Sequence, residues 1–276
     1  MLSRRNVIAA LGLAPLAKLT ACGSQTTGGS VDAIFPDTSP GDGDLCGPPA
    51  TAWARGGTAA MTAKACYPDP FGVTVLCPLM CATTAGPCTA PTSERRDVSD
   101  GLLGLPMRLS LKIVHGDTNA CGPVEGAVVE IWHTQRTGVY SGQTPSPGFC
   151  SGGDAQAPSM SYMRGTQTTD ANGRVDFDTC FPGWYPGRCI HIHISVKLAN
   201  QTYIVTQLFW PDSVNQEIFA THPEYSQFGQ PNTTNNTDGI FGADNVVEVA
   251  RMSDGAMLAW KVIGVRSSLT QPQCNL

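Results

Sequence analysis

Two histidines at alternate positions are the clearest candidates for chemistry in this sequence. Residues 181–194 read FPGWYPGRCIHIHI, so His191 and His193 are two positions apart. On a β-strand, side chains two apart point to the same face and lie about 7 Å from each other. Two neutral imidazoles arranged in this way can converge on one metal ion, while the isoleucines that alternate with them face a core. The pair alone fits two surface histidines on a half-exposed strand equally well.

The strand that carries the histidines is one of at least seven that the hydrophobic pattern predicts. The predicted strands cover residues 105–113, 124–133, 174–178, 189–196, 202–210, 246–249 and 257–265. In the first of them, Met107, Leu109 and Leu111 alternate with polar residues, which predicts a half-buried strand. Residues 214–222 form the only predicted helix, and the long loop 141–164 is expected to be functional or ordered by disulfides. The pattern predicts a mostly-β fold, either a β-sandwich or a barrel.

The composition agrees with a loop-rich β protein and excludes several other classes. The 276 residues include 30 glycines, 21 prolines and 11 cysteines, and only 14% are charged. Coiled coils contain little glycine or proline, and disordered chains are more charged and less apolar than this one. Beyond the N-terminus no apolar run approaches the roughly 18 residues of a membrane span. A formal net charge of −5 also argues against nucleic acid as a partner.

The N-terminus has the order of features that is typical of a bacterial export signal. Arg4 and Arg5 precede a short apolar stretch at residues 7–17, and the surrounding residues resemble a twin-arginine signal. The sequence Leu-Thr-Ala-Cys that ends at Cys22 resembles a lipoprotein box. We predict a signal peptide at 1–21, a flexible tether at 22–45 and a lipid anchor on Cys22 as the only link to a membrane. The protein would then lie in the cell envelope or outside the cell; a buried apolar helix is the alternative interpretation.

The cysteine count indicates an oxidising compartment. Ten cysteines remain if Cys22 carries lipid, which is enough for five disulfides, although spacing does not give their pairing. They are Cys46, Cys66, Cys77, Cys81, Cys88, Cys121, Cys150, Cys180, Cys189 and Cys274. A metal cluster that includes Cys77 and Cys81 is the alternative. Residues 46–90 hold five of the ten, and we expect them to pack on the main domain at 91–276 or to form a separate small module.

Several motifs resemble the intradiol ring-cleavage dioxygenases, the non-haem Fe(III) enzymes that cleave catechols. Residues 183–193 (GWYPGRCIHIH) are similar to the signature block of that family, and so are 126–133 (GAVVEIWH) with 138–142 (GVYSG). Residues 206–211 (TQLFWP) resemble a later strand, and 235–241 (NNTDGIF) resemble the C-terminal segment of its secreted branch. These motifs occur in order over residues 84–266. The resemblance implies an intradiol dioxygenase-like β-sandwich as the catalytic domain.

The resemblance also implies a set of site residues. The Fe(III) ligands would be Tyr140, Tyr185, His191 and His193, and the catalytic residues Arg188, Gln207 and Tyr185. Phenolate oxygen and imidazole nitrogen suit a hard ferric ion. Tyr185 would be the ligand that the substrate displaces, and Arg188 would stabilise anionic charge on the substrate. A rim tyrosine, a surface arginine and a strand-face glutamine are the alternative interpretations when each residue is taken alone.

The activity that follows from the resemblance is oxidative ring cleavage. A small catechol and O2 would give a cis,cis-muconate-type product, with cleavage between the two hydroxylated carbons. Residues 84–88 and 134–136 depart from the family pattern near the mouth of the site, which leaves the choice of catechol open. The alternatives are a non-catalytic envelope lipoprotein that uses the sandwich to bind a ligand, and a hydrolase or zinc or copper enzyme that uses His191 and His193.

Overall fold

The computed structural model describes residues 46–72, 77–118 and 120–276. The signal peptide, the tether and the lipid anchor at Cys22 all lie outside these residues and therefore stay predictions. Within the described part of the chain, no helix is both long enough and apolar enough to cross a membrane.

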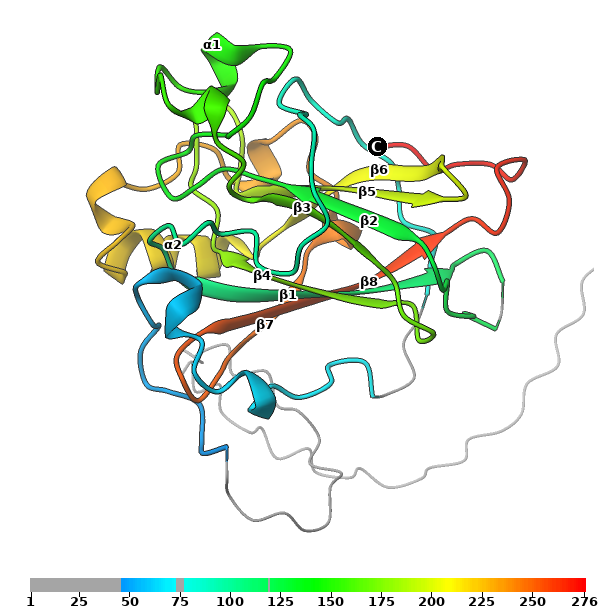
Figure 1. Ribbon diagram of the computed structural model, residues 1–276, viewed down its shortest axis with the longest axis horizontal. Helices are drawn as coiled ribbons and strands as arrows, with labels where there is room; N and C mark the ends of the chain where they lie inside the picture. The colour runs from blue at the N-terminus through cyan, green and yellow to red at the C-terminus, as the bar shows by residue number, and fades with distance from the viewer. Residues whose placement is uncertain (1–45, 73–76, 119) are drawn as a thin grey trace, which may run out of the picture. The chain divides into compact units, whose positions relative to one another are not determined.

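Two four-stranded sheets pack face to face, which confirms the predicted β-sandwich (Figure 1). The first sheet has the order β4 (Arg174–Cys180), β1 (Pro106–His115), β8 (Met257–Val265) and β7 (Glu248–Arg251). The second has the order β3 (Arg164–Thr168), β2 (Val128–Trp132), β5 (His191–Leu198) and β6 (Gln201–Phe209). Neighbouring strands are antiparallel except for β1 and β8, which run parallel.

The core between the sheets is built from the alternate apolar residues that the sequence predicts. Leu109 and Leu111 of β1 and Ile192 and Ile194 of β5 are fully buried in one apolar cluster. Helix α2 (Asp212–Thr221) covers one end of the sandwich, close to its predicted bounds, and α1 (Pro147–Cys150) is a single turn. The 3-10 turns are Gly57–Ala60, Lys64–Cys66, Ala157–Ser159, Ser226–Phe228, Asn235–Thr237 and Ala243–Asn245.

The sequence pattern missed strand β3. Its residues, RGTQT, have no apolar alternation, because β3 is the edge strand of its sheet and gains its order from pairing with β2. The preceding stretch, expected as one long loop, contains α1, a 3-10 turn and a disulfide at Cys150.

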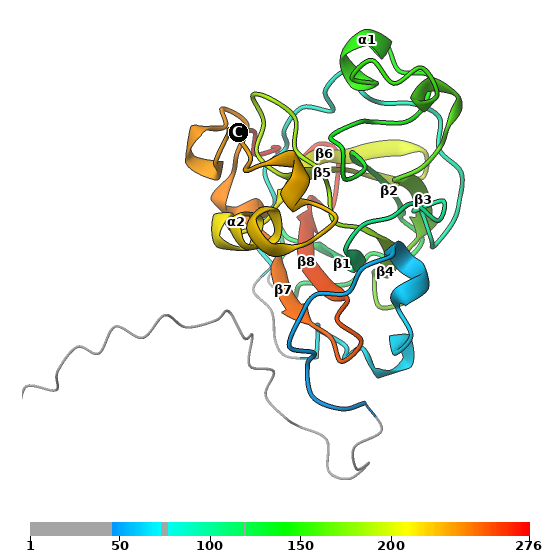
Figure 2. The same ribbon diagram turned by 90° about the vertical axis from the view of Figure 1, so that its left-hand side faces the viewer.

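Strand β1 is buried on both faces, so the prediction of a half-buried strand is wrong. Arg108 and Ser110 on its polar face are 6% and 0% exposed. Residues of the segment 46–72 cover this face: Lys64 forms an ion pair with Asp178, and Tyr67 lies 5.0 Å from the Arg108 guanidinium. Figure 2 shows this segment, coloured blue to cyan, beside β4 and β7.

Eight of the ten cysteines pair, which corrects the expected five disulfides to four among the described residues. The pairs are Cys46–Cys66, Cys77–Cys121, Cys81–Cys274 and Cys88–Cys150, whereas Cys180 and Cys189 are buried free thiols. Disulfides therefore occupy both Cys77 and Cys81, and the alternative of a metal cluster at these residues is wrong. Three of the four bonds join residues 77–88 to distant parts of the sandwich.

The ion pair of Asp178 makes the stability of the fold depend on pH. Burial raises the pKa of Asp178, but hydrogen bonds from Arg108 and Lys64 outweigh burial and hold this pKa below its usual value. The ionised carboxylate therefore stabilises the fold at neutral pH, and this contribution is lost as the pH falls below about 4. Asp178→Asn leaves the Arg108 guanidinium buried without its partner, and we expect it to lower the free energy of unfolding by about 3–5 kcal/mol at pH 7.

Urea denaturation at pH 7 and pH 3 measures this contribution. The wild type should lose more stability between the two values than Asp178→Asn does. Asp69→Asn is the matched control, because Asp69 pairs with Arg174 at 62% exposure and should change stability by less than about 1 kcal/mol. Equal acid sensitivity of wild type and Asp178→Asn would contradict the prediction.

Candidate metal centre

Strand β5 directs both histidines away from the core of the sandwich. His191 and His193 share the outer face of the sheet, opposite Ile192 and Ile194, as their spacing predicts. The pairing register brings Trp132 of β2 and Gln207 of β6 next to His193. Both imidazoles are nevertheless buried, at 3% and 2% exposure, because loops cover this face of the sheet.

The two tyrosines identified by resemblance meet the histidines at one point. The Tyr140 hydroxyl lies 3.1 Å from Nε2 of His191 and 3.2 Å from Nε2 of His193. The Tyr185 hydroxyl lies 3.2 Å from the same Nε2 of His191. Two phenol oxygens and two imidazole nitrogens are thus linked by three contacts of hydrogen-bond length.

The turn before Tyr140 packs closely against the turn before Tyr185, and this contact positions Tyr140 beside the histidines. Gly138 has a φ of +81°, and a Cβ atom there would lie 2.1 Å from the carbonyl oxygen of Trp184. Only glycine fits both the left-handed backbone and this contact. The Thr134 hydroxyl donates to the Gly183 carbonyl at 2.6 Å and joins the same two turns. The segments that carry Tyr140 and Tyr185 are therefore held side by side.

The surroundings of each histidine set its orientation. Nδ1 of His191 lies 2.7 Å from the Cys189 carbonyl, which can only accept, so Nδ1 carries the proton and Nε2 presents a lone pair. The ring of His193 stacks on Trp132 with the ring centroids 4.9 Å apart. A Cβ atom on Gly86 would lie 3.4 Å from Cε1 of His193, so the backbone of the covering segment packs closely on this ring.

Burial keeps all four groups uncharged when no cation is present. Burial, with a smaller effect of the Arg188 charge, lowers the pKa of His191 to about 3, and burial beside His191 lowers that of His193 well below its usual value. Burial also raises the pKa of Tyr140 well above 10 and raises that of Tyr185. The imidazoles thus keep their lone pairs, and ionisation of the phenols would need a nearby positive charge.

The donor set fits a hard metal ion. The oxygen atoms of two phenols and the Nε2 lone pairs of two neutral imidazoles face one point. These four atoms are the kind of donor set that can hold a cation. Among the described residues no group of three or more His, Cys, Asp or Glu side chains could hold a metal ion, whereas the cluster at His191 and His193 adds two tyrosine oxygens. Anionic phenolate oxygen with imidazole matches Fe(III).

Arg188 is held beside Tyr185 by two partners. Its Nε donates to Asp238 at 2.9 Å, and its Nη2 donates to Oε1 of Gln207. Gln207 is fully buried and donates in turn to the Thr84 carbonyl at 2.9 Å. The charge of Arg188 and its hydrogen bond lower the pKa of Tyr185, against the larger effect of burial. The guanidinium is therefore oriented toward the cluster.

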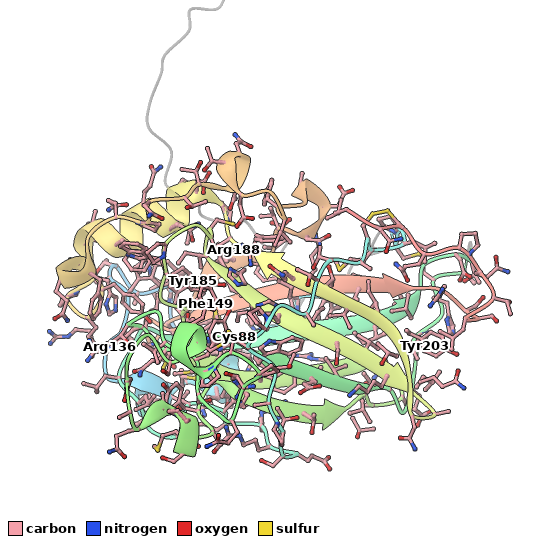
Figure 3. All side chains as sticks on the ribbon, turned by 90° about the horizontal axis from the view of Figure 1, so that it is seen from above. Cys88, Arg136, Phe149, Tyr185, Arg188 and Tyr203 are labelled. Carbon is pink, nitrogen blue, oxygen red and sulfur yellow. A yellow bond between two sulfur atoms is a disulfide. The ribbon has the colours of Figure 1, made fainter. Side chains whose placement is uncertain are left out.

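A disulfide and a buried arginine hold in place the two segments that cover the site. Cys88 and Cys150 join the segment 77–90 to the loop that follows Tyr140, and the Tyr140 amide donates to the Cys150 carbonyl at 2.9 Å. Arg164, 1% exposed, donates to the Cys88 carbonyl at 3.2 Å and to the Ser141 hydroxyl at 3.0 Å. Figure 3 shows Cys88 close to Tyr185, with Arg188 on the other side of that tyrosine.

Sequence reasoning missed part of this arrangement. The sequence motifs include Asp238 and Trp132 but indicate no role for either residue, and the cysteine spacing does not give the partner of Cys88. Of the remaining histidines, His133 and His222 are buried and contact Thr179 and the Ala54 carbonyl. Tyr162 is also buried and accepts a hydrogen bond from Gln135. These contacts give the three residues structural roles.

Comparisons with known proteins agree with the geometry. A family model described as a dioxygenase matches residues 89–224, which include the two tyrosines, the two histidines, Arg188 and Gln207. No curated protein matches the chain. An intradiol ring-cleavage dioxygenase from Tetranychus urticae is 28% identical, with a TM-score of 0.61 over 71% of this chain and 98% of its own.

Two further solved structures have the same fold. A second dioxygenase is 28% identical, with a TM-score of 0.62 over 71% of this chain and 97% of its own. The dioxygenase domain of a carbohydrate-binding fusion protein from Streptomyces sp. SirexAA-E is 22% identical, with a TM-score of 0.51 over 69% of this chain and 99% of its own. At that identity the last match supports the fold alone.

Removal of the Cys88–Cys150 disulfide should weaken metal binding. The bond fixes the backbone next to Tyr140, so Cys88→Ser with Cys150→Ser should raise the dissociation constant for Fe(III) by about 10–100-fold, the usual effect of losing support around a ligand. Iron content after dialysis against a chelator measures this. Cys46→Ser with Cys66→Ser is the control, because that disulfide lies within the N-terminal segment. Equal iron loss in both double variants would contradict the prediction.

Proposed function

Since the chain belongs to the intradiol ring-cleavage dioxygenase family, we propose that it uses non-haem Fe(III) and O2 to cleave a catecholic ring. Cleavage between the two hydroxylated carbons incorporates both oxygen atoms of O2 and gives a cis,cis-muconate-type product. The proposed ligands are Tyr140, Tyr185, His191 and His193. The convergence of their four donor atoms at 3.1–3.2 Å is the observation that carries the proposal.

Each proposed ligand has a distinct task. His191 and His193 offer neutral nitrogen lone pairs, and the hydrogen bond from Nδ1 of His191 to Cys189 fixes the tautomer that this requires. Tyr140 and Tyr185 offer anionic oxygen that offsets the charge of the metal. Bound Fe(III) would act as a Lewis acid toward the catechol oxygens and would hold the substrate in place.

The two tyrosines differ in their freedom to move. Tyr140 is 2% exposed and packs in an apolar cluster with Cys88, Trp132 and Cys150, whereas Tyr185 lies at the edge of this cluster and is only partly buried. Tyr185 is therefore the better candidate to yield its position to the substrate. Its oxygen can then accept a proton from an entering catechol hydroxyl.

Arg188 and Gln207 are proposed to act on the substrate and not on the fold. Asp238 and Gln207 hold the guanidinium beside the Tyr185 oxygen, in the place where negative charge develops on a bound catechol as its ring opens. A fixed cation in a buried site stabilises such charge without reorganisation. Trp132 covers one face of His193 and keeps water from it.

Replacement of Tyr140 should change both colour and activity. The iron-loaded wild type should show a phenolate-to-iron absorption band in the visible range. Tyr140→Phe should lose or shift this band and should lower kcat for O2 uptake with catechols by at least about a hundredfold, because a direct ligand contributes more than a supporting residue. Tyr203→Phe is the control, because Tyr203 lies at the far end of β6 (Figure 3). An unchanged spectrum in Tyr140→Phe would remove this residue from the site.

Arg188→Lys tests whether the cation next to Tyr185 must be held in place by both of its partners. Lysine keeps the charge but not the fork that contacts Asp238 and Gln207 together. We expect kcat to fall by about 10²-fold with little loss of bound iron, since the interaction acts on the developing charge. O2 consumption and iron content measure the two effects. Arg136→Gln is the control, because that guanidinium lies over Phe228 outside the cluster; a normal kcat in Arg188→Lys would contradict the role.

The non-catalytic alternative is not favoured. A ligand-binding module has no need to assemble two tyrosines, two histidines and a supported arginine around one point. A protein that stays colourless after iron loading and consumes no O2 with catechol, protocatechuate or hydroxyquinol would contradict the proposed function and favour that alternative.

A further inference from the structure

Phe149 is an exposed aromatic residue at the edge of the proposed site. Its side chain is 58% exposed, and its ring stands perpendicular to that of Tyr185 with the centroids 5.7 Å apart. Figure 3 shows Phe149 beside Tyr185, at the end of the sheet opposite Tyr203. The other large exposed apolar residues among those described are Leu103, Val128, Met160 and Leu276, none of which is aromatic. Phe149 is therefore the exposed apolar ring that a molecule entering over Tyr185 would meet.

The backbone under Phe149 is held in place. Its amide donates to the Ser146 carbonyl at 3.1 Å within α1. The next residue, Cys150, is bonded to Cys88, and its carbonyl accepts the hydrogen bond from Tyr140. An aromatic ring on a rigid support binds a ligand with little loss of conformational entropy. Phe149 thus differs from a lone exposed hydrophobic residue on a mobile loop.

Tyr185 has a charged neighbour and an apolar neighbour. Arg188, which is held by its partners Gln207 and Asp238, contacts it. The exposed ring of Phe149 also contacts Tyr185. A catechol whose hydroxyls reach the buried donor atoms must turn its opposite ring carbons toward the surface. A substituent on those carbons can then meet the ring of Phe149.

We propose that Phe149 determines specificity by packing against an apolar or aromatic substituent on the catechol ring. The inference rests on the proposed function and adds the substrate class: catechols substituted at the 4-position with an apolar group. An edge-to-face or stacked contact between two rings changes affinity by about two- to tenfold. The contact forms when the substrate binds, so it acts on KM and leaves kcat unchanged.

Two substrates and two variants test this role. Catechol and 4-phenylcatechol share the reacting atoms and differ only in the second ring. Phe149→Ala should raise KM for 4-phenylcatechol by about three- to tenfold, leave KM for catechol within about twofold, and leave kcat unchanged for both. Met160→Ala is the matched control, because Met160 is an apolar residue of the same loop at 42% exposure. Phe149→Tyr, which keeps the ring, should retain the preference of the wild type.

A binding measurement without turnover separates the contact from the chemistry. In the absence of O2, the dissociation constant of 4-phenylcatechol, followed by tryptophan fluorescence, should rise in Phe149→Ala by the same factor as KM. An active wild type with equal changes for both substrates, or with none, would overturn this inference alone. A wild type that binds and turns over neither substrate would overturn the proposed function and this inference with it.

Discussion

Burial of two imidazoles on the outward face of a sheet is the constraint on which the rest of the site depends. The alternation of β5 sends the isoleucines to the core, so His191 and His193 must face outward. A buried polar nitrogen needs a partner, and the nearest available partners are the hydroxyls of Tyr140 and Tyr185. The four groups therefore gather oxygen and nitrogen lone pairs at one point, where a bound cation could be held.

The cover over this face has little regular structure of its own. The segment 77–90 and the loop that follows Tyr140 are ordered mainly by the Cys88–Cys150 disulfide and by the hydrogen bonds of Arg164. Loops without regular secondary structure lose much conformational entropy when they order, and a crosslink reduces this cost by restricting the unfolded chain. The disulfide that holds the loops over the donor atoms also fixes the backbone next to Phe149, whose ring contacts Tyr185.

The charged and the apolar neighbours of Tyr185 come from distant parts of the chain. Asp238 belongs to a loop after α2, and its carboxylate accepts from both Arg188 and the Cys189 amide. Phe149 belongs to α1, the single turn in the segment before β3. Tyr185 contacts both Arg188 and Phe149. Changes in either segment can therefore alter substrate preference while the donor atoms on β5 stay in place.

The sequence by itself determined the features that depend on local periodicity. It predicted seven of the eight strands, helix α2 and the shared face of His191 and His193, because strand and helix periods are visible over short windows. Resemblance to a family added the tyrosines, Arg188 and Gln207. Only the tertiary structure decided the disulfide pairs, the burial of Arg108, the pairing of the polar strand β3, and the contacts of Asp238 and Phe149. Each of these joins residues far apart in the chain, and no local pattern encodes which distant segments meet.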